Sequence, residues 1–146
     1  MNSAVPTSAG PIPSDLPTSP AKSAPTLPAT FAPTTGLPDL DAMLRGVARG
    51  DNIVWQVQAL DDYRALVLPY AAAAQAQGRR LIYFRFAAHP PLLAGDSGAE
   101  LFTPRPEDGF DAFVDQVHSV IEAAGRETMY VFDCLSDLAD AWLSDR

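Results

Sequence analysis

Three side chains that could bind or transform a ligand stand at the ends of predicted strands. Arg85 lies at the end of a strand expected over 81–86, His89 follows that strand, and Asp133 closes a strand expected over 129–133. In open parallel sheets, ligands bind just beyond the carboxyl ends of the strands. We therefore expect Arg85 and His89 to face an anionic ligand there, the alternative being that Arg85 pairs with a neighbouring carboxylate.

Asp133 follows four apolar residues, a pattern that often ends a buried parallel strand. A carboxylate in this place can coordinate Mg²⁺ or orient a water molecule in nucleotide-hydrolysing sheets. The alternative is that Asp133 accepts hydrogen bonds from the backbone of the turn over 134–136. Asp133 is thus the candidate metal ligand, and no residue is named as catalytic.

The first predicted strand, over 53–58, leads into Asp61 and Asp62. A phosphate-binding loop at this point would need glycines and a lysine. The chain has no glycine between residues 51 and 77, and its single lysine is Lys22. Asp61 and Asp62 instead predict a helix start that they cap and whose dipole they complement. We therefore expect no cofactor.

Four further residues are predicted to be structural. Cys134 is the only cysteine, which excludes an internal disulfide, and we expect it to be a small buried side chain without a lowered pKa. His118 is expected on a solvated helix face among acidic residues. Trp55 and Trp142 are expected to pack in a core or an interface.

Helices and strands alternate along the second part of the chain. Helices are predicted over 40–45 (capped by Asp39), 61–77 (with Pro69 as a kink), 110–124 and from 137 onward, and strands over 53–58, 81–86 and 129–133. The residues after 86 are interpreted as a loop rich in proline and glycine. Alternating strands and helices with nearly continuous apolar strands predict an α/β fold, a parallel sheet with helices on both faces.

Residues 1–35 have a different composition from the rest. Proline, serine, threonine and alanine supply 25 of these 35 residues. Such a segment has too little apolar surface to offset its ordering entropy, so we predict a disordered, partly polyproline tail before a domain over 36–146. A docking ligand for a proline-reading domain is the alternative.

The charge balance excludes several classes of partner. The chain carries 18 Asp and Glu against 10 Lys and Arg, a net charge of −8. We therefore expect no nucleic-acid partner and no anionic membrane surface as a partner. The lack of a signal peptide, of a long apolar run and of paired cysteines favours the cytoplasm.

The order of these features resembles that of RecA-like ATPases of the KaiC type. The resemblance rests on the segments 35–44 and 49–51 before the first strand, and on Met129-Tyr-Val-Phe-Asp-Cys-Leu-Ser-Asp-Leu138, which is similar to a Walker B strand. It implies a P-loop fold in which ATP and Mg²⁺ would bind. At 58–63, where the family has Gly-Lys-Ser/Thr, this chain has Gln-Ala-Leu-Asp-Asp-Tyr, a degenerate Walker A.

The chain is also similar to members of this group associated with phosphoenolpyruvate synthase and pyruvate phosphate dikinase. The strings that carry the likeness are Gly50-Asp-Asn-Ile-Val-Trp-Gln56, Asp62-Tyr-Arg64, Tyr83-Phe-Arg-Phe86, His89-Pro-Pro-Leu-Leu93 and Tyr130-Val-Phe-Asp-Cys-Leu-Ser-Asp137. The resemblance implies an association with phosphoryl transfer from ATP to pyruvate, with the catalytic domains outside this chain.

RecA-like ATPases place a later strand between the first strand and the Walker B strand. Residues up to Arg146 do not include a counterpart. The resemblance therefore implies an incomplete fold that needs a protein partner or a missing C-terminal portion, and we expect poor stability of the chain alone.

These inferences give three hypotheses. The first is a catalytically degenerate RecA-like module with a regulatory, scaffolding or ligand-sensing role, and no catalysis by this chain alone. The alternative is the N-terminal fragment of a phosphoenolpyruvate-synthase-like phosphotransferase. A third is a small-molecule enzyme that uses Arg85, His89 and Asp133.

Overall fold

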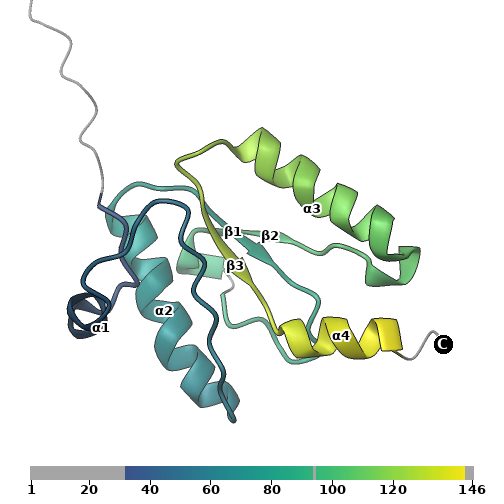
Figure 1. Ribbon diagram of the computed structural model, residues 1–146, viewed down its shortest axis with the longest axis horizontal. Coiled ribbons are helices and arrows are strands. Elements are labelled where there is room, and N and C mark those ends of the chain that lie inside the picture. Colours follow the sequence, from purple (N-terminus) through teal and green to yellow (C-terminus); the bar gives the residue numbers. More distant parts are fainter. Residues whose placement is uncertain (1–31, 94, 144–146) are drawn as a thin grey trace, which may run out of the picture. The chain divides into compact units, whose positions relative to one another are not determined.

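A computed structural model describes residues 32–93 and 95–143, which form an α/β fold with a parallel sheet (Figure 1). Within these residues the sheet has three strands, β1 (Leu81–Phe84), β2 (Ala99–Phe102) and β3 (Met129–Phe132). The helices are α1 (Pro38–Met43), α2 (Leu60–Ala76), α3 (Phe110–Ala124) and α4 (Leu135–Leu143), with 3₁₀ turns η1 (Gly95–Ser97) and η2 (Pro106–Asp108). Most of the expected tail, residues 1–31, lies outside the described residues.

The strand order is β2-β1-β3, and both pairings are parallel. Leu81 lies opposite Ala99 on one side and Met129 on the other, so the three strands are in step over their full length. All four residues of β1 are buried, because this strand has a neighbour on each side and a helix layer on each face. The predicted parallel sheet is therefore confirmed.

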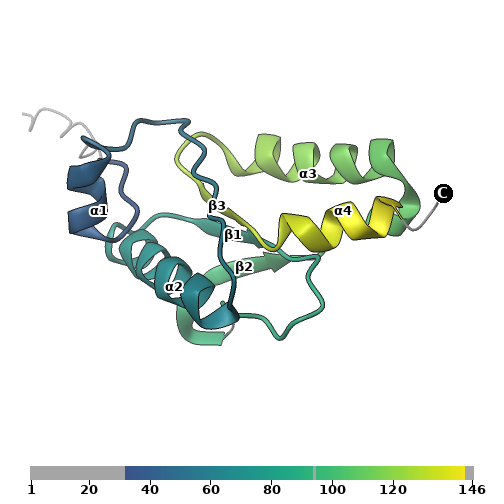
Figure 2. The ribbon, with the colours of Figure 1, turned by 60° about the horizontal axis from the view of Figure 1, so that its bottom comes forward.

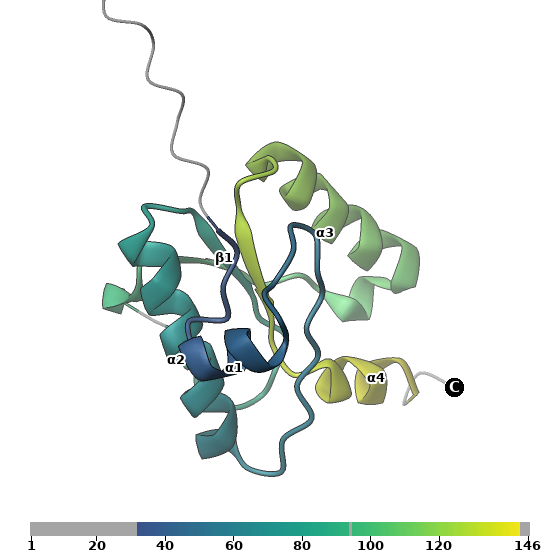
Figure 3. The same ribbon diagram turned by 60° about the vertical axis from the view of Figure 1, so that its left-hand side comes forward.

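One face of the sheet packs against α2. Successive side chains of a strand point to opposite faces, and Leu81 and Tyr83 turn to the α2 side. The core on this face contains Val67, Ala71, Ala74, Leu81, Tyr83, Leu93, Met129 and Val131. Figure 3 shows α2 and α3 on opposite sides of the strands, which places helices on both faces, as predicted.

The other face is aromatic and lies against α3. Phe84 stacks on Phe132 with ring centroids 4.8 Å apart, and Phe86 meets Phe113 of α3 edge to face at 5.8 Å. The predicted helix over 110–124 is confirmed at both ends. Its apolar residues recur at helical spacing, which orients one stripe toward the sheet.

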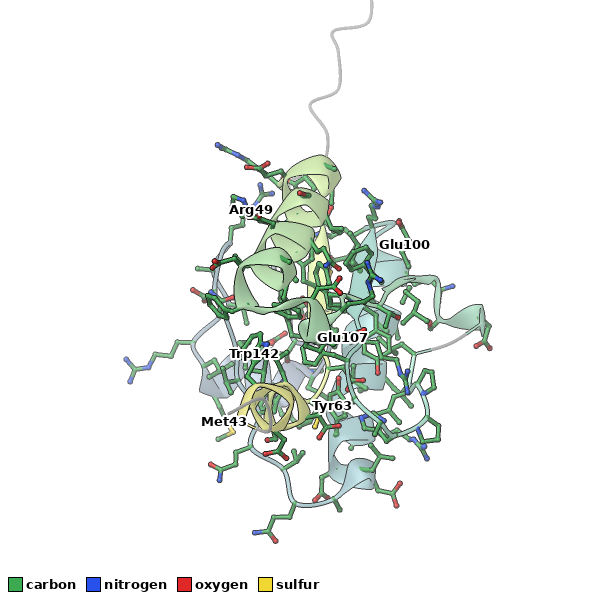
Figure 4. All side chains as sticks on the ribbon, turned by 90° about the vertical axis from the view of Figure 1, so that its right-hand side faces the viewer. Met43, Arg49, Tyr63, Glu100, Glu107 and Trp142 are labelled. Carbon is green, nitrogen blue, oxygen red and sulfur yellow. The ribbon has the colours of Figure 1, made fainter. Side chains whose placement is uncertain are left out.

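Trp142 joins α4 to the beginning of α3 (Figure 4). Its ring lies 5.1 Å from that of Phe110 and 5.3 Å from that of Phe113, both edge to face. The indole N–H donates to the carbonyl of Pro106 at 3.4 Å. The predicted packing role of Trp142 is confirmed. The helix predicted from 137 begins at Leu135, so Asp137 lies in its first turn.

The predicted strand over 53–58 is wrong. These residues run extended and exposed, and no backbone hydrogen bond joins them to another described segment. The segment begins near an ion pair between Arg49 and Glu127, 2.6 Å long, and leads into α2 (Figure 2). Its β-branched and aromatic residues favour an extended backbone. A strand also needs a neighbouring segment to pair with, and local residue preference does not determine whether one is present. Trp55 is accordingly 39% exposed.

Strand β2 was interpreted from the sequence as part of a loop, and that interpretation is wrong. Ala99–Phe102 is short and half exposed, because β2 is an edge strand. Its Glu100 carboxylate accepts a hydrogen bond of 2.6 Å from the Arg80 guanidinium, a bond across neighbouring strands. The glycines and prolines around it predict a loop. The segment is a strand because it pairs with β1, and its own residues do not indicate that pairing.

The prediction that Asp39 caps the first helix is also wrong. Leu37 holds the cap position of α1 without a side-chain bond, and Asp41 accepts hydrogen bonds instead. The donors are the backbone N–H of Thr35 at 2.8 Å, the Thr35 hydroxyl at 2.7 Å and the Thr34 hydroxyl. Partial burial opposes ionisation, but these bonds outweigh it and lower the pKa of Asp41.

The folded part begins before residue 36, since Thr35 is buried. Gly36 has φ +82°, and a Cβ there would lie 2.2 Å from the carbonyl oxygen of Pro69, inside α2. Only glycine allows the backbone to approach the helix this closely. Residues 34–36 are therefore part of the domain rather than of the tail.

Asp61 and Asp62 lie in the first turn of α2, but neither caps it. Ala59 holds the cap position, and no side chain bonds to the free N–H groups there. The two carboxylates still complement the positive end of the helix dipole. Pro69 lies inside α2, and Gly78 ends it with φ +61°.

Candidate functional site

Asp133 lies directly after β3, at the carboxyl edge of the sheet. Its backbone N–H donates to the carbonyl of Phe84 at 2.9 Å, which continues the pairing of β3 with β1. Its side chain is fully buried, and the Tyr83 hydroxyl donates to Oδ2 at 2.7 Å. The carboxylate is therefore held by the neighbouring strand. The alternative drawn from the sequence, that Asp133 accepts hydrogen bonds from the backbone of the turn over 134–136, is not what the structure has.

His89 lies on the loop after β1 and faces the same carboxylate. Its Nε2 is 3.2 Å from Oδ1 of Asp133, and the two form an ion pair when the imidazole is protonated. The other ring nitrogen, Nδ1, is 2.8 Å from the carbonyl of Pro90. A carbonyl only accepts, so Nδ1 carries a hydrogen. The ring orientation is thus fixed by its own loop on one side and by Asp133 on the other.

Arg85 stabilises that loop. Its backbone N–H donates to the Phe102 carbonyl at 2.8 Å, and its guanidinium donates to the carbonyl of His89. The structure brings Arg85, His89 and Asp133 together, but the side chains of Arg85 and His89 bind groups of this chain. The Arg85 Nε is buried and has no hydrogen-bond partner among the described residues.

Two tyrosines that the sequence reasoning missed complete the cluster. Tyr63 of α2 meets the His89 ring edge to face at 6.3 Å, and its buried hydroxyl has no hydrogen-bond partner within the described part. Burial, with the nearby charge of Asp133, raises the pKa of Tyr63. Burial and the hydrogen bond to Asp133 likewise raise the pKa of Tyr83. Both phenols therefore stay neutral at physiological pH.

Tyr63, Tyr83, Arg85, His89 and Asp133 are called the Asp133 cluster below. A signal for Tyr83 existed in the sequence. Parallel strands in step place the last residues of β1 and the residue after β3 at one edge. For Tyr63 the sequence indicated only a place on the apolar face of a helix, and that place does not determine where its hydroxyl points.

A second carboxylate closes the turn between β3 and α4. Asp137 accepts from the Ala88 backbone N–H at 3.0 Å and from the Cys134 thiol at 3.1 Å. These two bonds lower the pKa of Asp137. Burial and the same bond raise the pKa of the Cys134 thiol, which agrees with the expectation that it is not lowered. Cys134 itself has φ +45°, a strained turn for a non-glycine residue.

Residues 58–63, where the resemblance implies a phosphate loop, run into the beginning of α2. Asp61 and Asp62 are exposed there, and Arg64 lies 3.6 Å from Asp61. Two carboxylates at a helix N-terminus repel the anion that such a terminus would otherwise attract. This geometry does not offer a phosphate-binding cradle.

Metal ligands do not gather around Asp133. Within the described ranges, no group of three or more His, Cys, Asp or Glu side chains is placed to hold a metal ion. A cavity of about 180 Å³ lies at the other end of the sheet, against the first residue of β1. Its lining includes Ala71, Ala74, Gly78, Arg79 and Leu81.

The predicted surface position of His118 is confirmed. Its side chain is exposed and lies 3.7 Å from Glu122, one turn further along α3.

Among the described residues, none of the helices has the length and apolar character needed to span a bilayer.

Comparison with protein-family models, with curated proteins and with solved structures finds no match for this chain. The chemistry of the site therefore has to be argued from its geometry. A phenol, a carboxylate and an imidazole in a row can share a proton. In this arrangement they also bind the loop over 85–93 to the ends of β1 and β3.

Proposed function

We propose that this chain is a non-catalytic binding module with a RecA-like order of elements, and that it binds a protein rather than a nucleotide. The observation that carries the proposal is the Asp133 cluster. At the sheet edge where ligands bind in parallel α/β folds, Tyr83 and His89 contact Asp133, and Arg85 binds a backbone carbonyl. Side chains engaged in this way act as structural links.

The charge at α2 supports the same proposal. A nucleotide would bring several negative charges to the beginning of this helix, where Asp61 and Asp62 already stand. A bound Mg²⁺ would need Asp133 to release the buried Tyr83 hydroxyl and the partly exposed His89 imidazole. Both requirements oppose nucleotide binding.

Exposed apolar surface supports a protein partner. Phe110 is 60% exposed and Leu135 is 50% exposed, although both belong to helices that cover the sheet. Large apolar side chains left in water on the helices of a domain are available to form a surface that another protein covers.

The test is a titration of the full chain with a fluorescent ATP analogue and Mg²⁺. We expect no saturable binding at micromolar concentrations. Micromolar binding by the unmodified chain that is lost in Asp133→Ala and kept in Asp140→Ala would overturn the proposal. Asp140 is the matched control, because it is an exposed carboxylate on the adjoining helix.

A second candidate is the N-terminal part of a phosphoenolpyruvate-synthase-like phosphotransferase. The unpaired side of β3 favours it, since a strand from the remainder of such an enzyme would pair there. Reading the coding sequence beyond Arg146 tests this candidate. An in-frame continuation into a phosphotransferase supports it, and a stop codon followed by unrelated genes removes it.

A further inference from the structure

The side of β3 that faces away from β1 carries backbone groups that no described strand binds, although the Tyr130 N–H meets the hydroxyl of Tyr70 on α2. The N–H groups of Met129 and Asp133 donate to carbonyls in and next to β1, each at 2.9 Å. Alternate residues of a strand point their backbone groups in opposite directions, so Tyr130 and Phe132 present theirs to the other side. No described strand pairs with that side. This side is called the open edge of β3 below.

Apolar side chains accompany the open edge. Phe132 is 40% exposed on β3 itself, and Leu135 follows it at the beginning of α4. The extended segment over 53–57 adds Ile53, Val54, Trp55 and Val57, each at least 38% exposed. An edge with free N–H and C=O groups and apolar side chains is a template for another strand.

The extended segment runs the length of β3 without pairing with it. Arg49, just before the segment, bonds to Glu127, just before β3. Tyr63, just after the segment, meets His89, which contacts Asp133 at the end of β3. The two ends of the segment are thus anchored at the two ends of β3, while its middle stays unpaired.

The charged residues on the helices next to β3 indicate which kind of protein could add a strand. The two helices that β3 connects, α3 and α4, contain no lysine or arginine. They contain the acidic residues Asp111, Asp115, Glu122, Asp137 and Asp140, of which all but Asp137 are exposed. A second copy of this chain would bring the same negative charge, a net −8, to the contact. The surface favours a partner with positive charge.

We propose that the open edge of β3 binds an extended apolar segment of another protein, flanked by lysine or arginine residues, which adds to the sheet as a further strand. The proposal rests on the proposed function, because it names the partner class of the same module. Main-chain hydrogen bonds to Tyr130 and Phe132 provide the pairing, and the flanking charges meet the acidic residues of α3 and α4.

The test compares two synthetic peptides with one alternating valine, isoleucine and threonine core. One carries two lysines at each end and the other carries two glutamates. With the full chain at low salt, we expect the lysine peptide to bind at least about tenfold more tightly, and the ratio to shrink as salt is added. We also expect slower hydrogen exchange at the Tyr130 and Phe132 amides. Equal binding, or protection elsewhere alone, would overturn the proposal.

Two proline variants distinguish the two edges of the sheet. Phe132→Pro removes an N–H from the open edge, and proline is tolerated where the N–H faces solvent. Leu101→Pro is its matched control, because Phe102 bonds toward β1 and Leu101 therefore faces away from it on β2. We expect Phe132→Pro to lose at least about tenfold in lysine-peptide binding and Leu101→Pro to keep it. Equal effects would contradict strand addition at β3.

A charge variant tests the partner chemistry even where Phe132→Pro does not fold. Asp115→Arg combined with Asp140→Arg should bring the ratio of lysine-peptide to glutamate-peptide affinity close to one. An unchanged ratio would contradict the role of these acids. Failure of the peptide tests without ATP binding overturns this inference alone, whereas micromolar ATP binding overturns the proposed function.

Discussion

The Asp133 cluster and the open edge of β3 adjoin each other along the chain and are built in opposite ways. Asp133 is fully buried, its Oδ2 accepts a hydrogen bond from Tyr83, and its Oδ1 lies 3.2 Å from the His89 Nε2 without a hydrogen-bond partner among the described residues. Phe132, one residue earlier, is 40% exposed and turns its backbone away from β1. The cluster uses polar groups to hold the fold together, and the edge leaves polar and apolar groups free for a partner.

This contrast shows that polar residues at a strand end do not by themselves make a functional site. The decisive question is whether their partners lie within the chain. Buried polar groups that pair with each other specify one arrangement of the core. Large apolar side chains that stay partly exposed are the better indication of binding.

The largest expected effect separates the two regions by stability. Asp133→Ala leaves the Tyr83 hydroxyl and the His89 imidazole without their partner, so we expect a loss of about 3–5 kcal/mol in the free energy of unfolding. Urea denaturation measures it. The control, Asp140→Ala, should change the same free energy by no more than about 0.5 kcal/mol. Similar losses in both variants would contradict a structural role for the cluster.

The second largest effect is expected where Gly36 packs against the backbone of α2. Gly36→Ala places a Cβ against the Pro69 carbonyl at a left-handed φ, and we expect a loss of about 2–3 kcal/mol. Gly46→Ala has a similar φ and open space, so its cost should be about 1 kcal/mol. Thermal or urea unfolding compares them. An equal cost would mean that the close approach contributes nothing.

The third effect is the response to acid. Asp41 and Asp137 have lowered pKa values in the folded chain, so their hydrogen bonds stabilise it above the unfolded pKa and lose that effect as the pH falls below it. We expect stability to decrease below about pH 4 and Asp137→Asn to weaken that decrease. Urea midpoints measured between pH 7 and pH 3 test this. Asp140→Asn is the control, and an identical change in both variants would contradict the prediction.

The smallest effect lies at the open edge. Leu135→Ser removes a side chain that is already half exposed, so we expect the free energy of unfolding to change by no more than about 0.5 kcal/mol. Lysine-peptide binding should nevertheless weaken. A stability loss above about 1 kcal/mol would place Leu135 in the core and shift the boundary between the two regions.

Local patterns predicted the helices well and the sheet incompletely. Helix α3 was predictable because its apolar residues recur at helical spacing over four turns. The sequence predicts a strand over 53–58 and a loop at β2, and the structure has the reverse. Pairing depends on residues far away in the sequence, and neither segment contains that information.

The site was predictable in position but not in orientation. Arg85, His89 and Asp133 follow strands whose carboxyl ends meet, so their proximity was expected from a parallel sheet. Whether they face a ligand or one another depends on rotamers and on the course of a loop. The position of Tyr83 at this edge was predictable too, but its hydrogen bond was not, since an aromatic residue in a strand predicts burial rather than a hydrogen bond to a carboxylate.

The central place of β1 has a consequence for how the chain folds as it is synthesised. Both partners of β1 come later in the sequence, with Ala99–Phe102 on one side and Met129–Phe132 on the other. When residues 81–84 leave the ribosome, they have no strand to join, and the apolar face of α2 is the only cover made by then. Parallel pairing across such separations is slow. One edge of the most buried strand therefore stays unpaired until residues 129–132 have left the ribosome.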